Sequence, residues 1–285
     1  MIVGFIGLGR MGGPMVRRIV EAGHDVIAFD LSQEALDRAV ANGATVAASM
    51  ADLRHAEVVC SSLPATEHVE AAYFGPDGLV ASLAAGAVCV DLSTISIAGS
   101  RRCAARCLES GIDFVDAPVS GTSIHAEAGT LVVMAGGRAE AIERARPVLD
   151  SFASRVERVG DNGAGLELKL ITNRLLTTHV VAIAEAIVSI EQTDLSVTQC
   201  IELLRSGAVP KLLDYKAMPM VERNFTPQFT VDLMRKDLRL AAAELAEAPL
   251  AAAAHEVVEA TSASGLGDQD LGALITIVAQ RLAAD

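Results

Sequence analysis

Hydrophobic residues along the first half of the chain follow two alternating patterns. Short apolar runs at 2–6, 26–29, 58–63, 88–90, 114–115, 131–135 and 156–159 have the length and β-branched content of buried strands. Between them lie amphipathic segments of helical periodicity, the first two ending at Gly23 and at Asn42-Gly43. Strands that alternate with helices predict a doubly wound α/β sheet.

From Gly163 onward the pattern changes to helical periodicity alone. One continuous helical pattern spans residues 163–192 and would extend about 40 Å at 1.5 Å per residue. Further helices are expected near 195–206, 211–222, 230–247, 251–264 and 268–283. We therefore predict an α/β domain of residues 1–162 and an all-helical domain of residues 163–285, joined by the long interdomain helix.

The first predicted strand runs directly into Gly7-Leu8-Gly9-Arg10-Met11-Gly12, which opens a helical segment. Glycines at this spacing are typical of the Rossmann dinucleotide-binding turn. The first permits the tight turn, the second lets a pyrophosphate approach the backbone, and the third lets helix and strand pack closely. We expect Gly7, Gly9, Arg10, Met11 and Gly12 to bind the phosphates, with free N–H groups at the helix start.

Asp30 ends the second predicted strand, about 20 positions after the central glycine of the turn. A carboxylate at this place accepts hydrogen bonds from the adenosine ribose hydroxyls and repels a 2′-phosphate. The following Leu31-Ser32-Gln33 contains no arginine that could hold such a phosphate. The sequence therefore favours NAD over NADP as the cofactor.

Two further strand ends carry residues suited to the cofactor cleft. Leu63-Pro64 stops the run at 58–63, and Ser93-Thr94 follows the run at 88–90. Because ligands of doubly wound sheets lie at the carboxyl ends of strands, we expect Leu63, Pro64 and Thr94 at the cofactor. Helix capping or a turn is the alternative explanation for Ser93 and Thr94.

Two sets of polar residues could act on a substrate. Ser120-Gly121-Thr122 comes after the strand at 114–115, and a hydroxyl with backbone N–H groups suits a small carboxylate. Lys169 and Asn173 lie four residues apart in the long helix, so their side chains face the same way. The alternative for Lys169 is a solvated lysine on a helix surface.

Composition and charge narrow the classes of function. A net charge of −13 argues against a nucleic-acid partner, which requires a basic surface. The most apolar run, 180–190, contains Glu185 and is shorter than the ~20 residues of a membrane span. The N-terminus leads straight into a strand, which indicates no targeting peptide. The five cysteines lack further metal ligands and fit a reduced, cytoplasmic chain without a metal site.

Taken together, these motifs resemble the β-hydroxyacid dehydrogenase family, typified by 3-hydroxyisobutyrate dehydrogenase and tartronate semialdehyde reductase. The resemblance covers nearly the whole chain. It rests on Gly7 to Met15, Asp91 to Thr94, Asp116 to Gly121, Gly163 to Asn173, and Phe229 followed by Lys236 to Ala241.

The resemblance implies that Lys169 is the catalytic acid/base, that Asn173 helps to position it and the substrate, and that Ser120 with Gly121 holds the substrate carboxylate. It also implies that Thr94 lies near the nicotinamide and that Lys236 reaches back from the helical domain to the cleft. We therefore expect an NAD-dependent dehydrogenase that interconverts a small β-hydroxy acid and its semialdehyde.

The chain departs from the family pattern on the substrate side. Thr172 precedes Asn173 where many members have a first asparagine, and Thr122 replaces the usual glycine, as in glyoxylate and succinic semialdehyde reductases. Ser123-Ile124-His125 replaces a glycine-rich segment. These replacements leave the substrate open, and we interpret His125 as a surface-loop residue rather than a substrate contact.

Two other functions remain as alternatives. A non-catalytic dinucleotide-binding sensor would need the glycine turn and Asp30, but not Lys169, Asn173 and Ser120 together. An imine reductase of related fold would generally lack the lysine. We also expect a homodimer or homotetramer, in which alanine-rich faces at 241–243 and 251–254 allow close helix approach.

Overall fold

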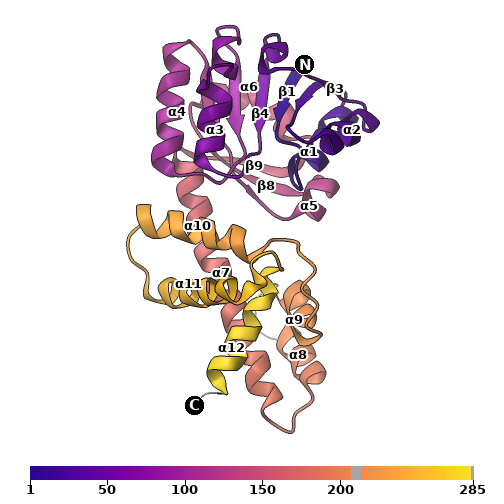
Figure 1. Ribbon diagram of the computed structural model, residues 1–285, viewed down its shortest axis with the longest axis vertical. Helices are drawn as coiled ribbons and strands as arrows, with labels where there is room; N and C mark the ends of the chain where they lie inside the picture. Colours follow the sequence, from indigo (N-terminus) through magenta and orange to yellow (C-terminus); the bar gives the residue numbers. More distant parts are fainter. Residues whose placement is uncertain (207–212, 284–285) are drawn as a thin grey trace. The chain divides into compact units, whose positions relative to one another are not determined.

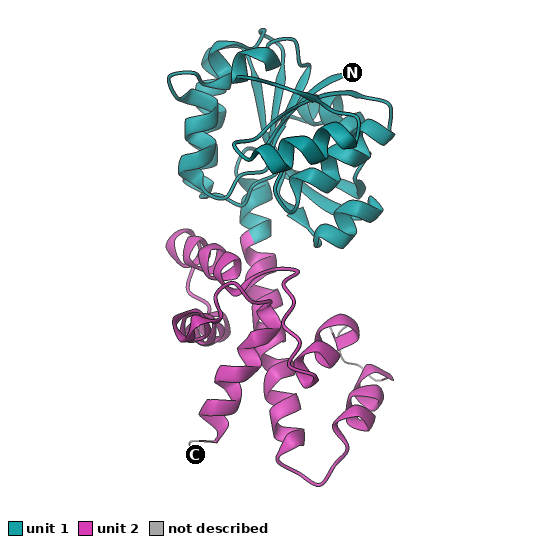
Figure 2. Ribbon diagram, turned by 45° about the vertical axis from the view of Figure 1, so that its right-hand side comes forward, with its two compact units in different colours: residues 1–169 teal, residues 170–285 magenta. Residues whose placement is uncertain are grey.

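The computed structural model describes residues 1–206 and 213–283 of the chain. The chain divides into two compact units, residues 1–169 and 170–285 (Figure 2). The long helix α7 (Ala164–Glu191) begins in the first unit and continues into the second. The first unit is α/β and the second is helical, as the hydrophobic pattern predicted. The placement of the domain boundary between residues 162 and 163 stays a prediction.

Within the fully described residues 1–169, the strands form one nine-stranded sheet of order β3-β2-β1-β4-β5-β6-β8-β7, with β9 paired to β8. The strands are β1 (Ile2–Ile6), β2 (Asp25–Phe29), β3 (Thr45–Val46), β4 (Val58–Ser61), β5 (Val88–Asp91), β6 (Asp113–Asp116), β7 (Val119–Ser120), β8 (Leu131–Gly136) and β9 (Ala153–Gly160). Strands β1 to β6 pair in parallel. Strand β8 runs antiparallel to β6 and β7, so the sheet is mixed at this edge.

Helices cover both faces of this sheet (Figure 1). The helices are α1 (Gly12–Glu21), α2 (Gln33–Ala41), α3 (Thr66–Phe74), α4 (Ile97–Glu109), α5 (Ser123–Ala128) and α6 (Ala139–Leu149), with short 3₁₀ turns at Met50–Leu53 and Leu79–Ala81. Helices α1, α2 and α6 contribute to one hydrophobic cluster. Helices α3 and α4 contact each other, and the ring of Tyr73 in α3 packs edge-on against Phe114 of β6 at 5.8 Å.

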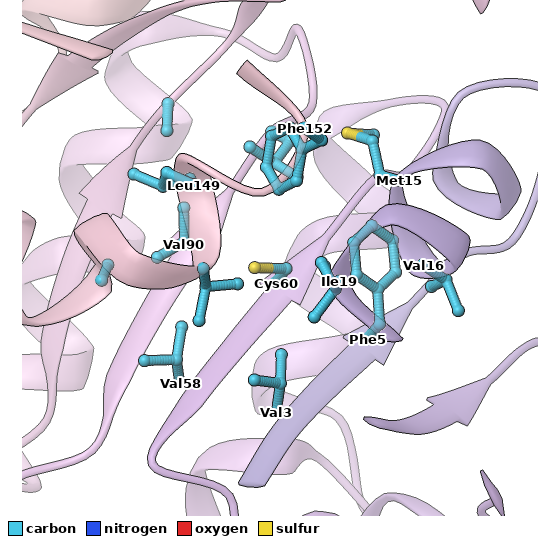
Figure 3. Close-up of a cluster of buried hydrophobic side chains, with 14 of the residues drawn as sticks. Val3, Phe5, Met15, Val16, Ile19, Val58, Cys60, Val90, Leu149 and Phe152 are labelled. Atoms are coloured by element: carbon cyan, nitrogen blue, oxygen red, sulfur yellow. The ribbon is translucent and has the colours of Figure 1, made fainter. Parts of the chain in front are cut away.

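Alternating strand residues explain the two-sided packing. Val3 and Phe5 of β1 point into the cluster shown in Figure 3, where they meet Met15 and Ile19 of α1. Cys60 of β4 lies in the same cluster. Because successive strand side chains point to opposite faces, strands with both faces buried read as continuous apolar runs.

Two short elements differ from the sequence prediction. Strand β7 has only two residues, and α5 has only six, so neither gives a readable hydrophobic period. The interpretation of His125 as a loop residue was wrong, because His125 lies in the first turn of α5, although its side chain is exposed.

Strand β9 begins at Ala153 rather than at 156.

The second unit contains the rest of α7 together with α8 (Val197–Ser206), α9 (Leu213–Val221), α10 (Val231–Glu244), α11 (Pro249–Thr261) and α12 (Leu274–Leu282). The predicted start of a helix at 211 lies outside the described residues. The helix expected from 268 begins only at Leu274, because Asp270 ends a non-helical segment and its carboxylate accepts from the backbone of Gly272.

Helix α7 is long and apolar enough to cross a membrane by length and composition, with a mean hydropathy of 1.2 over 18 residues. Part of its apolar side chains lies inside the protein: Val180, Ala184, Ile187 and Val188 belong to the core of the second unit. Leu168, Ile171 and Leu175 of the same helix are exposed. Helix α7 is therefore a core helix of the second unit along only part of its apolar surface.

Candidate active site

The glycine turn joins β1 to α1 in a shape that depends on glycine. Gly7 has φ +91°, and a Cβ there would lie 2.3 Å from the carbonyl oxygen of Ser62. A Cβ at Gly12 would lie 1.9 Å from the carbonyl oxygen of Gly7, so α1 packs on the turn at a distance that only glycine permits. A Cβ at Gly9 would meet no atom within 4 Å. The open space at Gly9 fits the approach of a phosphate group to the backbone.

Asp30 lies directly after β2 and is tied to the glycine turn. Its Oδ2 accepts a hydrogen bond from Leu8 N at 2.6 Å, and its Oδ1 accepts one from Ser32 N at 2.8 Å. An ionised carboxylate has about four acceptor positions, so each oxygen can accept a further hydrogen bond. The carboxylate is therefore held in place and can still receive two ribose hydroxyls.

The ends of β4 and β5 are linked by a buried serine. The Ser93 hydroxyl donates to Asp91 Oδ1 at 2.6 Å and accepts from Leu63 N at 2.8 Å. This link joins the segment with Leu63 and Pro64 to the segment with Thr94, the three residues expected at the cofactor. From the sequence, Ser93 was a candidate for the cofactor cleft with a helix cap or a turn as the alternative, and Asp91 had no predicted role.

Ser120 occupies the end of β7, where it pairs with Val132 of β8. The chain then turns at Gly121, whose φ is +130° and whose Cβ would lie 2.7 Å from Leu131 Cδ2. Thr122 follows as the residue before α5. The three residues expected at the substrate carboxylate thus form one tight connection from strand to helix, with Gly121 exposed.

A buried carboxylate holds the first turn of α7. Asp116, at the end of β6, accepts from Gly163 N at 2.7 Å through Oδ1 and from Leu166 N at 3.1 Å through Oδ2. Backbone N–H groups at a helix start lack partners within the helix, and a negative charge there is favourable. Lys169 follows one turn later and is 9% exposed. Asp116 therefore fixes the start of the helix that carries Lys169.

Burial raises the pKa of Asp116 to about 7, against the opposing effect of the hydrogen bonds from Gly163 and Leu166. The folded protein then keeps this proton at pH values where the unfolded chain, with a pKa near 3.8, has lost it. The contribution of Asp116 to the free energy of unfolding therefore falls as pH rises from about 4 to about 7.

We predict that Asp116→Asn removes this pH dependence. Urea unfolding across this pH range should give a free-energy difference, unmodified protein minus variant, that decreases as pH rises. Asp25→Asn, which removes a carboxylate at an exposed position of β2, is the matched control. A constant difference for Asp116→Asn would contradict the assignment of a raised pKa.

Asn173 lies one turn after Lys169 on α7 and is 2% exposed. Its Nδ2 donates to Asp237 Oδ2 at 2.7 Å, and Lys236 Nζ lies 2.9 Å from Asp237 Oδ1. Because a carboxylate only accepts, the amide NH₂ faces Asp237 and the amide oxygen faces elsewhere. Asp237 thus brings Asn173 and Lys236 together within the second unit. Sequence reasoning gave Asp237 no role; its position beside Lys236 was the available signal.

The candidate residues therefore form two groups. Within residues 1–169 the glycine turn, Asp30, the β4 and β5 ends and Ser120 lie on one sheet, and within 170–285 Asn173 and Lys236 share Asp237. Helix α7 is continuous through both and carries Lys169 and Asn173. In residues 1–206 and 213–283, no three His, Cys, Asp or Glu side chains lie close enough to hold a metal ion.

The Rossmann sheet with its glycine turn places the protein among the dinucleotide-binding oxidoreductases, and two family models agree. The model for the NAD binding domain of 6-phosphogluconate dehydrogenase matches residues 2–160. The model for the NAD-binding region of NADP-dependent 3-hydroxyisobutyrate dehydrogenase matches residues 163–278. The chain belongs to the 3-hydroxyisobutyrate dehydrogenase family.

Individual relatives agree with this family. An NAD-dependent L-serine dehydrogenase of Pseudomonas aeruginosa is 40% identical, over 84% of this chain and 83% of the relative. A 3-hydroxyisobutyrate dehydrogenase of the same organism is 38% identical over 90% of each chain. The structure of Mycobacterium tuberculosis 3-hydroxyisobutyrate dehydrogenase with L-serine is 33% identical, with a TM-score of 0.88 over 97% of this chain and 98% of that one.

The expected fold and enzyme class are confirmed by these similarities. The protein is a dehydrogenase of the family that acts on small hydroxy acids and their semialdehydes. The imine reductase and the non-catalytic sensor are not favoured. The roles of single site residues and the preference for NAD over NADP stay predictions.

Proposed function

We propose that this protein is an NAD-dependent dehydrogenase that oxidises a small β-hydroxy acid to its semialdehyde, or reduces the semialdehyde, with Lys169 as the general acid/base. The observation that supports this most is the placement of Lys169 on α7. The lysine is buried, the start of its helix is held by Asp116, and Asn173 one turn later is held by Asp237.

Lys169 supplies a proton site that hydride transfer requires. When a hydroxy acid is oxidised, the hydroxyl proton must leave as the carbonyl forms; in reduction, the carbonyl oxygen gains negative charge and takes a proton. The amine of Lys169 accepts the proton in the first direction, and the ammonium donates it in the second. The nicotinamide cofactor, when bound, accepts or supplies the hydride.

The other proposed substrate residues orient the hydroxy acid. Ser120 and Gly121, with Thr122 beside them, hold the carboxylate through hydroxyl and backbone N–H donors. Asn173 directs the reacting oxygen toward Lys169, and Lys236 adds a positive charge for the substrate or cofactor. Asp237 supports this arrangement because it fixes both Asn173 and Lys236.

The cofactor residues of the proposal are those of the first unit. The backbone from Gly7 to Gly12, with Arg10 and Met11, faces the pyrophosphate, and Asp30 accepts from the ribose hydroxyls. The part of the cofactor cleft between the pyrophosphate and the nicotinamide is lined by Leu63, Pro64 and Thr94. The held carboxylate of Asp30 favours NAD because a 2′-phosphate would place like charges together.

The preference for NAD gives a first test at Asp30. Asp30→Ala should lower kcat/KM for NAD by about 10- to 100-fold, since hydrogen bonds to a charged group contribute about 1.5–3 kcal/mol. The variant should lose less activity with NADP, so the NAD/NADP ratio of kcat/KM should fall. Asp37→Ala, on the exposed face of α2, is the control and should leave the ratio unchanged. A preference for NADP in the unmodified protein would show that our interpretation of Asp30 is wrong.

The substrate is tested by NADH formation from a panel of small hydroxy acids. The panel contains 3-hydroxyisobutyrate, L- and D-serine, D-glycerate, 3-hydroxypropionate and 4-hydroxybutyrate. The names of the relatives direct attention to 3-hydroxyisobutyrate and L-serine. Turnover of one acid supports the proposal, whereas bound NAD with no turnover across the panel would contradict it.

We further propose a cytoplasmic homodimer or homotetramer. Four alanines on two helices are exposed, and their small side chains would allow helices of neighbouring subunits to approach closely: Ala242 and Ala243 of α10 and Ala252 and Ala253 of α11. Ala241 is buried inside the second unit. The five cysteines are free thiols, which fits a reducing compartment.

A further inference from the structure

Helix α5 begins with an unusual cap. The backbone N–H of Thr122 donates to His125 Nδ1 at 3.1 Å, and Thr122 Oγ1 lies 3.0 Å from the same nitrogen. In a capping box the third helical residue is usually glutamate or glutamine, whose side chain accepts from the N-cap backbone. Here the imidazole of His125 takes that place. Because a backbone N–H can only donate, Nδ1 is the unprotonated ring nitrogen.

The same imidazole covers the turn that leaves β7. A Cβ at Gly121 would lie 3.0 Å from His125 Cβ and 3.2 Å from His125 Cγ. His125 therefore restrains two consecutive residues, Gly121 by packing and Thr122 by hydrogen bonding. Ser120, the residue before them, is fixed on its other side by pairing with β8. The strand-to-helix connection is thus held at both ends.

We propose that His125 is a positioning residue for substrate binding, which holds Gly121 and Thr122 so that Ser120 and Gly121 meet the substrate carboxylate. This inference rests on the proposed function. His125 need not touch the substrate itself. Since the N–H of Thr122 is committed to His125, the carboxylate is bound by the hydroxyl of Ser120 and the N–H of Gly121.

The first test is His125→Ala, assayed with L-serine and 3-hydroxyisobutyrate. KM for the hydroxy acid should rise by about 3- to 30-fold, the range that corresponds to loss of a helix cap. The value of kcat and KM for NAD should stay within about twofold, because the proton site and the cofactor residues are unchanged. His55→Ala, exposed in the turn before β4, is the matched control and should leave all three values unchanged.

His125→Glu separates positioning from simple loss of a side chain. Glutamate is the usual acceptor of a capping box, so this variant should restore KM to within about twofold of the unmodified protein. A KM in His125→Glu as high as that in His125→Ala would overturn the acceptor role. An unchanged KM in His125→Ala would overturn the inference itself.

Two measurements distinguish failure of this inference from failure of the proposed function. Hydrogen exchange at Thr122 needs no activity: protection should be lost in His125→Ala and kept in His125→Glu, and equal protection in both would overturn the cap. Ser120→Ala tests the carboxylate site alone. If it raises KM while His125→Ala does not, only the inference fails; if neither does, the proposed role of Ser120 fails too.

Discussion

Lys169→Ala is expected to lower kcat by about 10²- to 10⁴-fold, the loss typical of a missing general acid/base. The side chain is nearly buried, and its helix is fixed at the start by Asp116 and one turn later through Asn173. Water therefore has little freedom to replace the amine at the reacting oxygen. Steady-state kinetics with the hydroxy acid identified from the panel measure the effect.

The matched control for Lys169 is Arg101→Ala. Arg101 of α4 forms an exposed ion pair at 2.6 Å with Glu167, which lies in the first turns of α7. Such pairs contribute at most about 1 kcal/mol, so the control should keep nearly full kcat. NAD titration should give the same affinity for both variants and the unmodified protein. If the Lys169→Ala variant retains more than about a tenth of kcat, Lys169 does not act in the proton transfer.

The second large effect is expected in the glycine turn, where alanine at Gly12 and alanine at Gly9 should change the free energy of unfolding very differently. Gly12→Ala should destabilise the first unit by about 3 kcal/mol or more, beyond ordinary overpacking, because its Cβ would meet the Gly7 carbonyl oxygen. Gly9→Ala should change the free energy of unfolding by less than about 1 kcal/mol, since its Cβ enters open space. Urea unfolding measures both.

NAD affinity should respond to Gly9 although stability does not. A methyl group at Gly9 would occupy the space where a phosphate approaches the backbone, so the dissociation constant for NAD should rise by at least about tenfold. Gly13→Ala, inside α1 and one residue after the motif, is the comparison variant, with only Leu8 O near its Cβ at 3.3 Å. Unchanged NAD affinity in Gly9→Ala would contradict the placement of the cofactor phosphate at this turn.

The sequence predicted those strands and helices whose hydrophobic pattern extends over enough residues to be recognised. Strands such as β1 and β4, buried on both faces, are continuous apolar runs, and the 28-residue α7 repeats its helical pattern long enough to be recognised. Strand β7 and helix α5 are too short for this, and their positions depend on pairing with β8 and on the cap at Thr122. The mixed edge of the sheet was therefore not predicted.

The candidate site was predictable where a local motif carries it. The glycine turn and Asp30 are close in sequence, so their spacing is visible. Asp116 contacts Gly163 from 47 residues away, and Asp237 contacts Asn173 from 64 residues away. The number of residues between such partners follows no rule, because only the folded structure brings them together.

The continuity of α7 has a consequence for chimeras built from two members of this family. A crossover before Gly163 would import Lys169 and Asn173 together, but Asp116 would then cap a foreign helix. A crossover after Glu191 would keep both residues, but Asn173 would face a foreign partner in place of Asp237. An exchange between two members should therefore carry α7 together with Asp116 and Asp237, the two carboxylates that hold it.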